Sequence, residues 1–312
     1  MHSWPELAGR PRVGYLGPAG TFSEEALLAS AAADAVEPVA LASIYDTVMA
    51  LRDEDVSFSI VPIENSLEGS ISVTLDLLAG EASDVEIVGE ALLRVRHSLI
   101  AAAQIPLEEI DTVVTHPHVP GQCTRFLRGE LAHARIVPAS STAEAVRMAV
   151  ESATGSQAAI GTLLAARIYG GTVIREGVED REDNETRFVW LARPSENRSA
   201  AGAGRPASAL PPLREGTREK WKTSLVFWGA GAERPGWLVR CLDEFARNDI
   251  NLTKIESRPR RDGLGSYMFF ADLAGRVDAA PVVQALAGLH ERCEAVRVLG
   301  SYPAAERAEW AR

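Results

Sequence analysis

The stretch EDREDNETRFVWL, residues 179–191, joins an acidic segment to a run of apolar side chains. Thr186 and Arg187 stand at the junction, directly before Phe188. The apolar run is typical of a buried strand, which would hold the threonine and the arginine rigidly at its start. Arginine offers a bidentate fork for a carboxylate, and threonine offers both a donor and an acceptor. This segment alone favours the simpler interpretation, in which Arg187 pairs with one of the neighbouring acids.

The sequence around this stretch predicts an α/β domain that spans residues 12–194. Short apolar runs alternate there with Ala-rich periodic segments, the pattern of strands and helices around a sheet. Strands are expected at residues 12–16, 58–62, 112–115, 158–160 and 187–192, and helices at residues 23–33, 70–79, 120–129 and 142–152. Residues 84–103 are expected to form two β-rich passages that lead from one lobe into another.

A second domain is expected after a linker. Residues 195–219 are poor in large apolar side chains and rich in Pro, Gly, Ala and Ser, so they cannot bury enough surface to order themselves. Residues 220–303 then carry the pattern strand, helix, strand, strand, helix, strand. This βαββαβ order predicts a small sheet with two helices on one face.

The composition fits an ordinary globular protein, with 46% hydrophobic and 24% charged residues. The formal net charge of −11 disfavours nucleic acid as a partner. We find neither a secretory signal nor an apolar run long enough to span a membrane, so a cytoplasmic location without a membrane partner is expected. Cys123, Cys241 and Cys293 are far apart in the sequence and lack CxxC spacing, which argues against a disulfide framework and a zinc site. Three buried thiols are expected instead.

Two segments combine the end of a strand with the start of a helix. In YLGPAGTFSEEAL, Thr21 lies three residues before Glu24, which is the spacing of a capping box. In PASSTAEAVRM, Ser141 and Glu144 repeat this spacing. The N–H groups of such a helix start attract an anion, although an ordinary helix cap explains the pattern too. The glycines of the first segment are spaced GxxGxxG, so it is not a dinucleotide fingerprint.

Two further predicted strands end in polar residues. These are Glu64, Asn65 and Ser66 in VPIENSLEGS, and His116, His118 and Gln122 in THPHVPGQC. Ligands of open α/β sheets bind at the carboxyl ends of the strands, whereas a plain turn is the alternative. The two histidines have no third ligand nearby and give only a weak metal signal.

Taken together, two helix starts, an arginine and several neutral polar groups suit a small substrate with two negative charges. The sequence contains no P-loop, metal-binding box or nucleophile elbow. A reaction that needs no cofactor and is driven by electrostatics is therefore indicated.

The ordered motifs resemble those of the prephenate dehydratase family. The motifs are GPAGTFSEEAL, VPIENSLEGS, HPHVPGQC, SSTAEA, AAIGTLLAARIYG and NETRF, followed by INLTKIESRP, which resembles the ACT regulatory domain. The resemblance covers nearly the whole chain apart from the linker and the first ten or so residues. It implies a two-lobed catalytic domain similar to type 2 periplasmic binding proteins, with the active site in the cleft, followed by a ferredoxin-like ACT domain. It also implies decarboxylating dehydration of prephenate to phenylpyruvate, in phenylalanine biosynthesis, without a cofactor.

The resemblance assigns roles to the residues of the motifs. Thr186 is tied most firmly to catalysis, together with Asn65 and Gln122. A threonine hydroxyl is a poor general acid, so we expect Thr186 to donate a hydrogen bond to the departing oxygen, while the proton comes through water or from an acid such as Glu64. The substrate-binding residues are expected to be Thr21, Ser66, Ser141 and Arg187. The assignment requires Asn65, Gln122 and Thr186 to share one cavity.

The ACT resemblance implies a pocket for phenylalanine between paired domains. The expected effector-binding residues are Pro235, Gly236, Trp237, Leu238, Asn251, Leu252, Glu256, Ser257, Arg258 and Pro259. Trp237 stands where the family usually has alanine, so its indole could fill or reshape the pocket, and the identity of the effector stays open. His118 likewise stands where a glutamine is usual. Pairing of ACT domains implies a homodimer or a homotetramer.

Two other functions fit the same residues. Arogenate dehydratase acts on a substrate with an amino group where prephenate has a keto group. A solute-binding protein or a small-molecule sensor could use the same two-lobed fold without catalysis. The lack of an export signal argues against a solute-binding protein. The lack of a helix-turn-helix argues against a transcriptional sensor.

Overall fold

The computed structural model describes residues 9–32, 34–194, 211, 213, 220–229 and 234–305. The chain divides into two compact units, of which Met1–Thr74 and Ala91–Phe188 form the first and Leu75–Glu90 and Val189–Arg312 form the second. Of the expected linker, residues 195–219, only Pro211 and Leu213 belong to the described residues. No helix in the described ranges combines the length and the apolar character that crossing a membrane requires.

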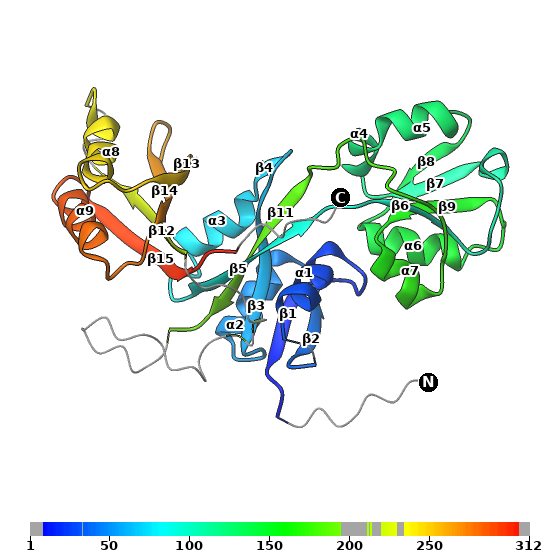
Figure 1. Ribbon diagram of the computed structural model, residues 1–312, viewed down its shortest axis with the longest axis horizontal. Helices are drawn as coiled ribbons and strands as arrows, with labels where there is room; N and C mark the ends of the chain where they lie inside the picture. The colour runs from blue at the N-terminus through cyan, green and yellow to red at the C-terminus, as the bar shows by residue number, and fades with distance from the viewer. Residues whose placement is uncertain are drawn as a thin grey trace. The chain divides into compact units, whose positions relative to one another are not determined.

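The first sheet has the strand order β2-β1-β3-β11-β5, and β4 pairs with β3. Its strands are β1 (Arg12–Leu16), β2 (Glu37–Leu41), β3 (Phe58–Asn65), β4 (Gly69–Ser70), β5 (Glu86–Arg94) and β11 (Glu185–Ala192). β1 runs parallel to β2 and to β3, and the helices α1 (Phe22–Ser30) and α2 (Ile44–Arg52) make the crossovers between these strands (Figure 1). We call β1–β4 with α1 and α2 the first lobe. Helix α3 (Ser72–Ala79) follows β4.

The second sheet, in the order β10-β6-β9-β7-β8, builds the second lobe. Its elements are β6 (Ser98–Ala101), η1 (Leu107–Glu109), β7 (Thr112–Thr115), α4 (Val119–Gln122), α5 (Thr124–Glu130), β8 (Arg135–Pro138), α6 (Thr142–Val150), β9 (Gln157–Gly161), α7 (Leu163–Tyr169) and β10 (Thr172–Glu176). Leu99 and Ala101 pack with Phe126 of α5, whereas Ile100 packs with Val146 of α6. Successive strand residues point to opposite faces, so helices cover both faces of this sheet (Figure 1).

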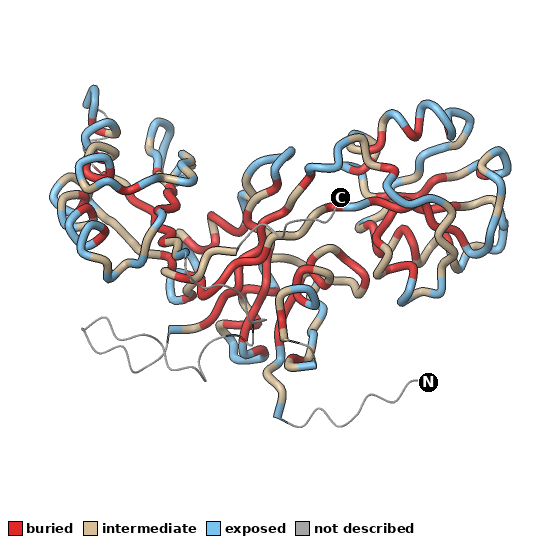
Figure 2. Tube along the Cα trace, viewed as in Figure 1, coloured by how far each residue is buried: buried red, intermediate tan, exposed pale blue. Residues whose placement is uncertain are grey.

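The C-terminal module has the predicted βαββαβ order. Its elements are β12 (Trp221–Trp228), α8 (Trp237–Arg247), β13 (Leu252–Pro259), β14 (Tyr267–Ala274), α9 (Ala280–His290) and β15 (Ala295–Pro303). The sheet order β13-β14-β12-β15 is antiparallel throughout. Phe227 of the sheet shares one core with Cys241 of α8 and Leu289 of α9, so both helices pack on one face. Figure 2 shows buried residues concentrated along the strands.

Charged contacts join the C-terminal module to β5 and α3 within the second unit. The Lys222 ammonium lies 2.8 Å from a Glu90 carboxylate oxygen, and both side chains are largely buried. The Arg258 guanidinium binds both carboxylate oxygens of Asp76, at 2.8 and 2.9 Å. Arg261 contacts the same carboxylate. Paired buried charges of this kind are costly to break, because the remaining partner is left uncompensated.

The sequence-based elements are confirmed where the apolar pattern is strong. Strands β1 and β7 have the expected bounds, and residues 84–103 form β5 and β6, which belong to different sheets. The helix expected at residues 120–129 is instead two short helices, since the chain leaves helical geometry at Cys123. The sequence reading missed β2, α2, β8, α7 and β10. Of these, β2, β8 and β10 are edge strands, and none of their residues is buried.

Gly20 brings the two lobes into close contact. Its carbonyl accepts a hydrogen bond of 2.6 Å from the Thr162 hydroxyl at the start of α7. The backbone has a φ of +88°, and an added Cβ would lie 2.8 Å from Cα of Ala165. Gly69 has a similar φ of +83° but open space around it. The two glycines therefore share the conformation and differ only in the close approach.

We expect Gly20→Ala to lower the thermal midpoint of unfolding more than Gly69→Ala does. Both substitutions place alanine at positive φ, which costs about 1–2 kcal/mol. Only the substitution at residue 20 adds a clash, which costs about 1–3 kcal/mol more. Thermal unfolding followed by circular dichroism measures the difference, and equal midpoints would contradict the close approach of Gly20 to α7.

Glu25 of α1 makes a second contact between the lobes. Its carboxylate accepts a hydrogen bond from the Leu164 backbone, at the start of α7. Burial raises the pKa of Glu25 from 4.5 to about 7, although the Leu164 hydrogen bond and the Arg167 guanidinium oppose the rise. Between these two pH values the unfolded chain releases a proton that the folded chain retains. Stability therefore falls as the pH rises through this window, and stays lower above it.

Glu25→Gln should stabilise the protein at pH 8 and change its stability little at pH 4. The amide keeps an acceptor for Leu164 but carries no charge to desolvate, so the gain at pH 8 is up to about 3 kcal/mol. Denaturant titrations of the wild type and the variant at both pH values measure the gain. The same effect at both pH values would contradict a buried ionisable carboxyl at this position.

Candidate active site

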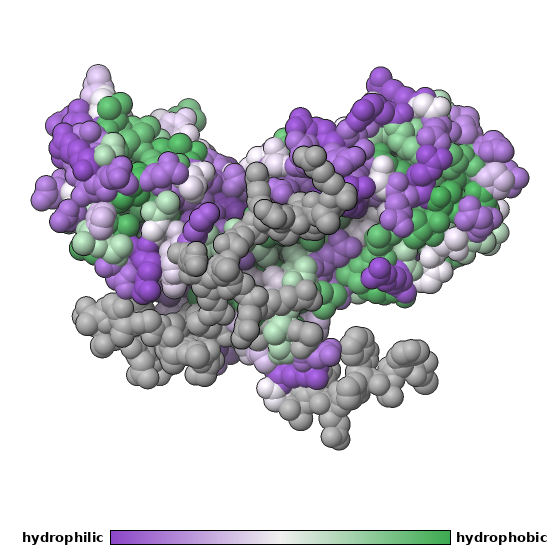
Figure 3. Space-filling model, in the orientation of Figure 1, coloured by the Kyte–Doolittle hydropathy of each residue, from purple (hydrophilic) through white to green (hydrophobic). Residues whose placement is uncertain are grey.

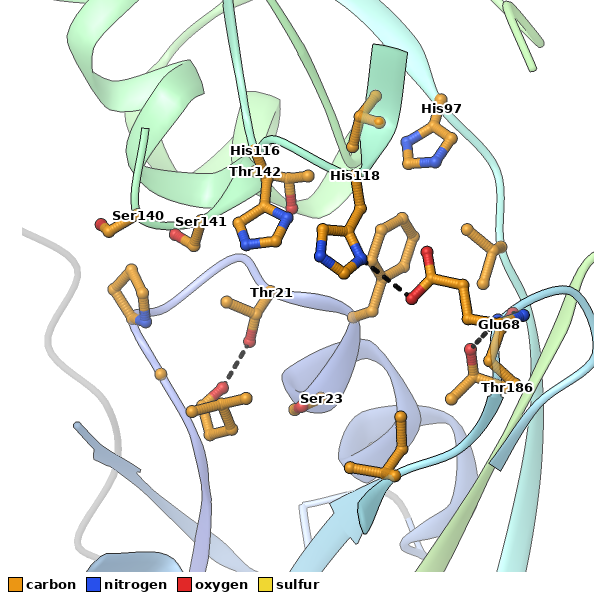
Figure 4. Close-up of a pocket in the computed structure, with 18 of the residues that line it drawn as sticks. Thr21, Ser23, Glu68, His97, His116, His118, Ser140, Ser141, Thr142 and Thr186 are labelled. Carbon is orange, nitrogen blue, oxygen red and sulfur yellow. Dashed lines mark hydrogen bonds and ion pairs between the residues drawn. The ribbon is translucent and has the colours of Figure 1, made fainter. Parts of the chain in front are cut away.

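A cavity of about 620 Å³ is lined by both lobes of the first unit, a size usual for small-molecule sites (Figure 4). Its polar lining consists of Thr21, Ser23, Asn65, Glu68, His97, His116, His118, Gln122, Ser140, Ser141, Thr142, Asn184 and Thr186. Leu16, Phe22, Ile71, Val95 and Val119 are among the apolar residues that complete it. Asn65, Gln122 and Thr186 thus share one cavity, as the sequence-based assignment required.

Strands β3 and β11 are neighbours; β3 ends and β11 begins at this cavity, where their side chains alternate between two faces. Asn65 Nδ2 donates to Thr186 Oγ1 over 2.9 Å. One residue away on each strand, Arg187 Nη2 lies 3.0 Å from Glu64 Oε2. Successive strand residues point to opposite faces, so the amide and the hydroxyl face the cavity while the ion pair lies on the other face. Because Thr186 Oγ1 accepts this hydrogen bond, its hydroxyl hydrogen can donate to a ligand in the cavity.

Gln122 is held in one orientation by a buried network. His97 Nε2 lies 3.0 Å from Gln122 Oε1, and Asn184 Nδ2 donates to the same oxygen over 3.1 Å. Burial lowers the pKa of His97, so the neutral ring donates from Nε2. Asn184 in turn accepts from Asn65 Nδ2 over 2.9 Å. The amide of Gln122 therefore keeps its Nε2 hydrogens on the cavity side.

Glu68 accepts from two side chains of the second lobe. Gln122 Nε2 donates to its Oε1 over 2.8 Å, and His118 Nδ1 lies 3.1 Å from its Oε2. Figure 4 shows the His116 ring beside His118, and their centroids are 5.1 Å apart. Burial, followed by the neighbouring His118, lowers the pKa of His116. The carboxylate therefore links the turn after β3 to α4 across the cavity.

The ends of two helices also face the cavity. Thr21 caps α1 by accepting from the Glu24 N–H over 3.4 Å and donates its own hydrogen to the Leu16 carbonyl over 2.8 Å. Ser141 caps α6 by accepting from the Glu144 N–H over 3.0 Å. Both N-caps are therefore confirmed, whereas the glutamates of the two expected capping boxes bind other groups: Glu24 accepts from the Gly20 N–H, and Glu144 accepts from Arg147. The first-turn N–H groups and the positive ends of both dipoles favour an anion there.

The cavity lining contains no lysine or arginine among the described residues. Positive potential in it comes from the two helix ends. Among the described residues, no group of three or more metal-ligating side chains could hold a metal ion. The arrangement suits a small anion that is bound largely by neutral donors.

Three predicted site residues lie outside the lining of the cavity. Glu64 and Arg187 bind each other on the opposite strand face. Arg187 is buried, with 7% of its surface exposed, and does not border the cavity, so its contact with a substrate carboxylate stays a prediction. The hydroxyl of Ser66 accepts from the Glu185 N–H over 2.9 Å and fixes the segment before β11 rather than facing the cavity.

Three residues at the site escaped the sequence reading. They are Glu68, His97 and Asn184. Glu68 lies within VPIENSLEGS, and Asn184 is the one amide among the acids of EDREDNETRF. Asn184 could have been found from the sequence, because a single amide within a run of acids is not required in a loop that is merely exposed to solvent. His97 follows β5 without a motif of its own.

Trp237 fills the core of the C-terminal module. Only 5% of its surface is exposed, and its indole Nε1 donates to the Arg292 carbonyl over 2.9 Å. Its ring lies near Phe227 and Phe269, with centroids 6.2 and 5.8 Å apart. The indole therefore packs beneath α8, and Gly236, with a φ of +77°, turns the chain into the helix. Pro235 and Leu238 flank these two residues.

The remaining predicted effector residues belong mainly to β13, where side chains alternate in exposure. Glu256 and Arg258 are partly buried, whereas Ser257 and Pro259 are exposed. Arg258 is engaged with Asp76. Leu252 packs against the module core, and the exposed Asn251 precedes it. These residues thus face two sides of the strand and do not all meet at one surface of a single module.

Family comparisons match both parts of the chain. Residues 13–196 match the prephenate dehydratase family model, and residues 231–291 match the ACT domain model. A prephenate dehydratase of Mycolicibacterium vanbaalenii is 38% identical over 307 residues, which cover 94% of this chain and 91% of that relative.

Solved structures agree with these matches. A prephenate dehydratase from Arthrobacter aurescens in complex with L-Phe is 34% identical, with a TM-score of 0.79 over 93% of this chain and 89% of that one. GqqA, described as a novel type of quorum quenching acylase, is 28% identical, with a TM-score of 0.78 over 94% of this chain and 98% of that one. The match of a family model to more than half of the residues, together with the identity to the relatives, shows that this chain belongs to the prephenate dehydratase family.

Proposed function

We propose that the chain converts prephenate into phenylpyruvate, carbon dioxide and water, a step of phenylalanine biosynthesis. The observation that carries this proposal is the single cavity in which Asn65, Gln122 and Thr186 meet. The identity to curated prephenate dehydratases supports the choice of substrate.

The chemistry needs little from the protein beyond positioning and hydrogen bonds. As the bond to the ring carboxylate breaks, its electron pair enters the ring and the carbon–oxygen bond of the ring hydroxyl breaks. Formation of the aromatic ring drives both events, so the site mainly fixes the substrate and stabilises the departing oxygen. Thr186 donates a hydrogen bond to that oxygen. Its own Oγ1 already accepts a hydrogen bond from Asn65, so its hydroxyl hydrogen is directed to the substrate.

The two carboxylates of prephenate are bound by the starts of α1 and α6, where Thr21 and Ser141 cap the helices. Neutral donors of the cavity, among them Gln122 Nε2, complete their hydrogen bonds. Arg187 acts indirectly, since its ion pair with Glu64 holds β3 and β11 in the alternation that turns Asn65 and Thr186 to the cavity. Ser66 acts in the same way on the segment before β11.

The proton for the departing oxygen comes from the cavity lining or from water. Glu64 is engaged with Arg187 and does not border the cavity. Among the described lining residues, the titratable groups are Glu68, His97, His116 and His118. His97 is buried and neutral, so Glu68, His116 and His118 are the side chains suited to exchange this proton.

The C-terminal module makes the enzyme responsive to an aromatic amino acid, with L-phenylalanine as the effector. The likeness to the Arthrobacter aurescens enzyme in complex with L-Phe supports this assignment. Since the Trp237 indole is packed into the module core, it does not occupy the loop surface itself.

A homodimer or homotetramer is proposed from the surface of this module. β13 and β15 are its edge strands, and exposed apolar side chains include Ile255 of β13, Val239 of α8 and Val283 of α9. Figure 3 shows apolar side chains at the visible surface of the module. Edge-to-edge pairing would cover an exposed strand edge. A cytoplasmic location stays a prediction.

The direct test is to add prephenate to the purified protein without added metal or cofactor and to follow phenylpyruvate. We expect turnover that L-phenylalanine changes and that tyrosine or tryptophan changes less. Arogenate in place of prephenate tests the alternative substrate. Binding of prephenate without product would favour the sensor function, and faster turnover of arogenate would replace the substrate assignment.

Thr186→Val should reduce kcat by about 10²- to 10³-fold and leave KM nearly unchanged, because the lost hydrogen bond forms mainly with the departing oxygen. Thr186→Ser keeps the hydroxyl and is the matched control, for which we expect near-normal turnover. Steady-state kinetics on prephenate measure both variants. Normal kcat in the valine variant would remove Thr186 from the mechanism.

A further inference from the structure

Two cysteines that are far apart in the sequence meet in the C-terminal module. The sulfur of Cys241, in α8, lies 3.8 Å from the sulfur of Cys293, in the turn after α9. Cys241 is fully buried, whereas Cys293 is partly exposed rather than buried as the sequence suggested. A disulfide has a sulfur–sulfur distance of about 2.05 Å, so the two atoms need to approach by less than one atomic diameter.

The contact between α8 and this turn is fixed by hydrogen bonds on both sides of the sulfurs. Trp237, Cys241 and Glu244 are spaced i, i+4 and i+7, so they lie on one face of α8. The Trp237 indole donates to the Arg292 carbonyl over 2.9 Å, and Arg292 Nε donates to Glu244 Oε1 over 2.7 Å. Three successive positions on the helix face thus contact two successive residues of the turn. The thiols are therefore already in register.

The surroundings also favour reaction at this pair over the third cysteine. The hydrogen bond to Cys293, and then the Arg292 and Arg240 guanidinium groups, lower the pKa of Cys241 against the opposing effect of burial, while the same hydrogen bond and burial raise the pKa of Cys293. Burial and the neighbouring Glu179 and Asp180 instead raise the pKa of Cys123 to about 12. Since the thiolate is the reactive form, Cys241 is the thiol of the pair favoured to ionise, and Cys293 lies in contact with it as the resolving thiol.

We propose that Cys241 and Cys293 are a modification site, at which a peroxide converts the two thiols into a disulfide within the module. One thiolate displaces hydroxide from hydrogen peroxide and becomes a sulfenic acid. The other thiol then attacks that sulfur and releases water. In sum, two thiols and one hydrogen peroxide give one disulfide and two waters, and the two electrons pass from the sulfurs to the peroxide oxygens.

The position of the pair gives the disulfide a regulatory consequence, which rests on the proposed effector function. Cys241 lies one helical turn after Trp237, the first residue of α8, and the PGWL segment that starts this helix is the predicted effector loop. Closing the sulfur–sulfur gap moves the turn that accepts the Trp237 hydrogen bond. The disulfide therefore changes the affinity of the module for L-phenylalanine.

The first measurement needs neither substrate nor effector. The full-length protein is reduced, freed of reductant and treated with hydrogen peroxide, after which free thiols are counted and the peptides are mapped by mass spectrometry. We expect the loss of two of the three thiols, a Cys241–Cys293 linkage, and full reversal by dithiothreitol. Cys123→Ser should still lose two thiols, whereas Cys293→Ser, at the partly exposed position, should form no linkage within the chain. Sulfinic acid without a linkage, or a linkage that appears only between chains, would overturn the proposal.

The second measurement is direct calorimetric binding of L-phenylalanine to the reduced and the oxidised protein. We expect binding to weaken by about tenfold on oxidation, within the range usual for coupled sites, and to recover with dithiothreitol. Peroxide should not change the affinity of Cys293→Ser. An unchanged affinity in the oxidised wild type would overturn the regulatory part. A protein that binds L-phenylalanine in neither state would refute the effector assignment itself and leave the linkage result standing.

Discussion

The alternation of side chains along β3 and β11 is the constraint on which the site depends. A strand presents successive residues to opposite faces, so two neighbouring strands can bring one residue of each pair to the cavity and must turn the next away. Asn65 and Thr186 take the cavity face, and Glu64 and Arg187 form an ion pair on the other. A shift of either strand by one residue would turn the charged residue of that strand, Glu64 or Arg187, toward the cavity and separate it from its partner. The Glu64–Arg187 contact thus opposes the shift that would destroy the site.

Among the described residues that line the cavity, hydrogen-bond donors for an anion are present but no fixed cation. A guanidinium would bind the substrate carboxylates about as strongly in the ground state as in the transition state. Binding that is equal in the two states does not raise kcat. Helix ends and neutral amides bind a carboxylate less tightly but are already oriented, so they cost no reorganisation when the charge moves. The chain Thr186, Asn65, Asn184, Gln122 and His97 is joined throughout by hydrogen bonds. This preorganisation is the property that a decarboxylation driven by aromatic ring formation needs most.

The sequence predicted the site better on helices than on strands. Capping boxes are local, so Thr21 and Ser141 were found from a spacing of three residues and lie where expected. The contact expected for Arg187 did not take strand alternation into account, and in the structure this side chain pairs with Glu64 on the face opposite Asn65 and Thr186. The pairing of β3 with β11 joins residues about 120 positions apart, and no local pattern encodes such a contact. Edge strands such as β8 were not predicted, because their largely exposed residues do not show the alternation of apolar and polar side chains that marks a strand.

The C-terminal module shows how a substitution can be absorbed by a fold. A tryptophan at a loop position usually held by alanine suggested a filled or reshaped effector pocket, yet the indole lies inside the module. It can do so because its N–H meets the Arg292 carbonyl, and a buried indole without that acceptor would be costly. The same carbonyl belongs to the residue before Cys293, so the indole and the thiol pair depend on one turn. Trp237, which departs from the family pattern, and Cys241 therefore contact two successive residues of one turn, Arg292 and Cys293.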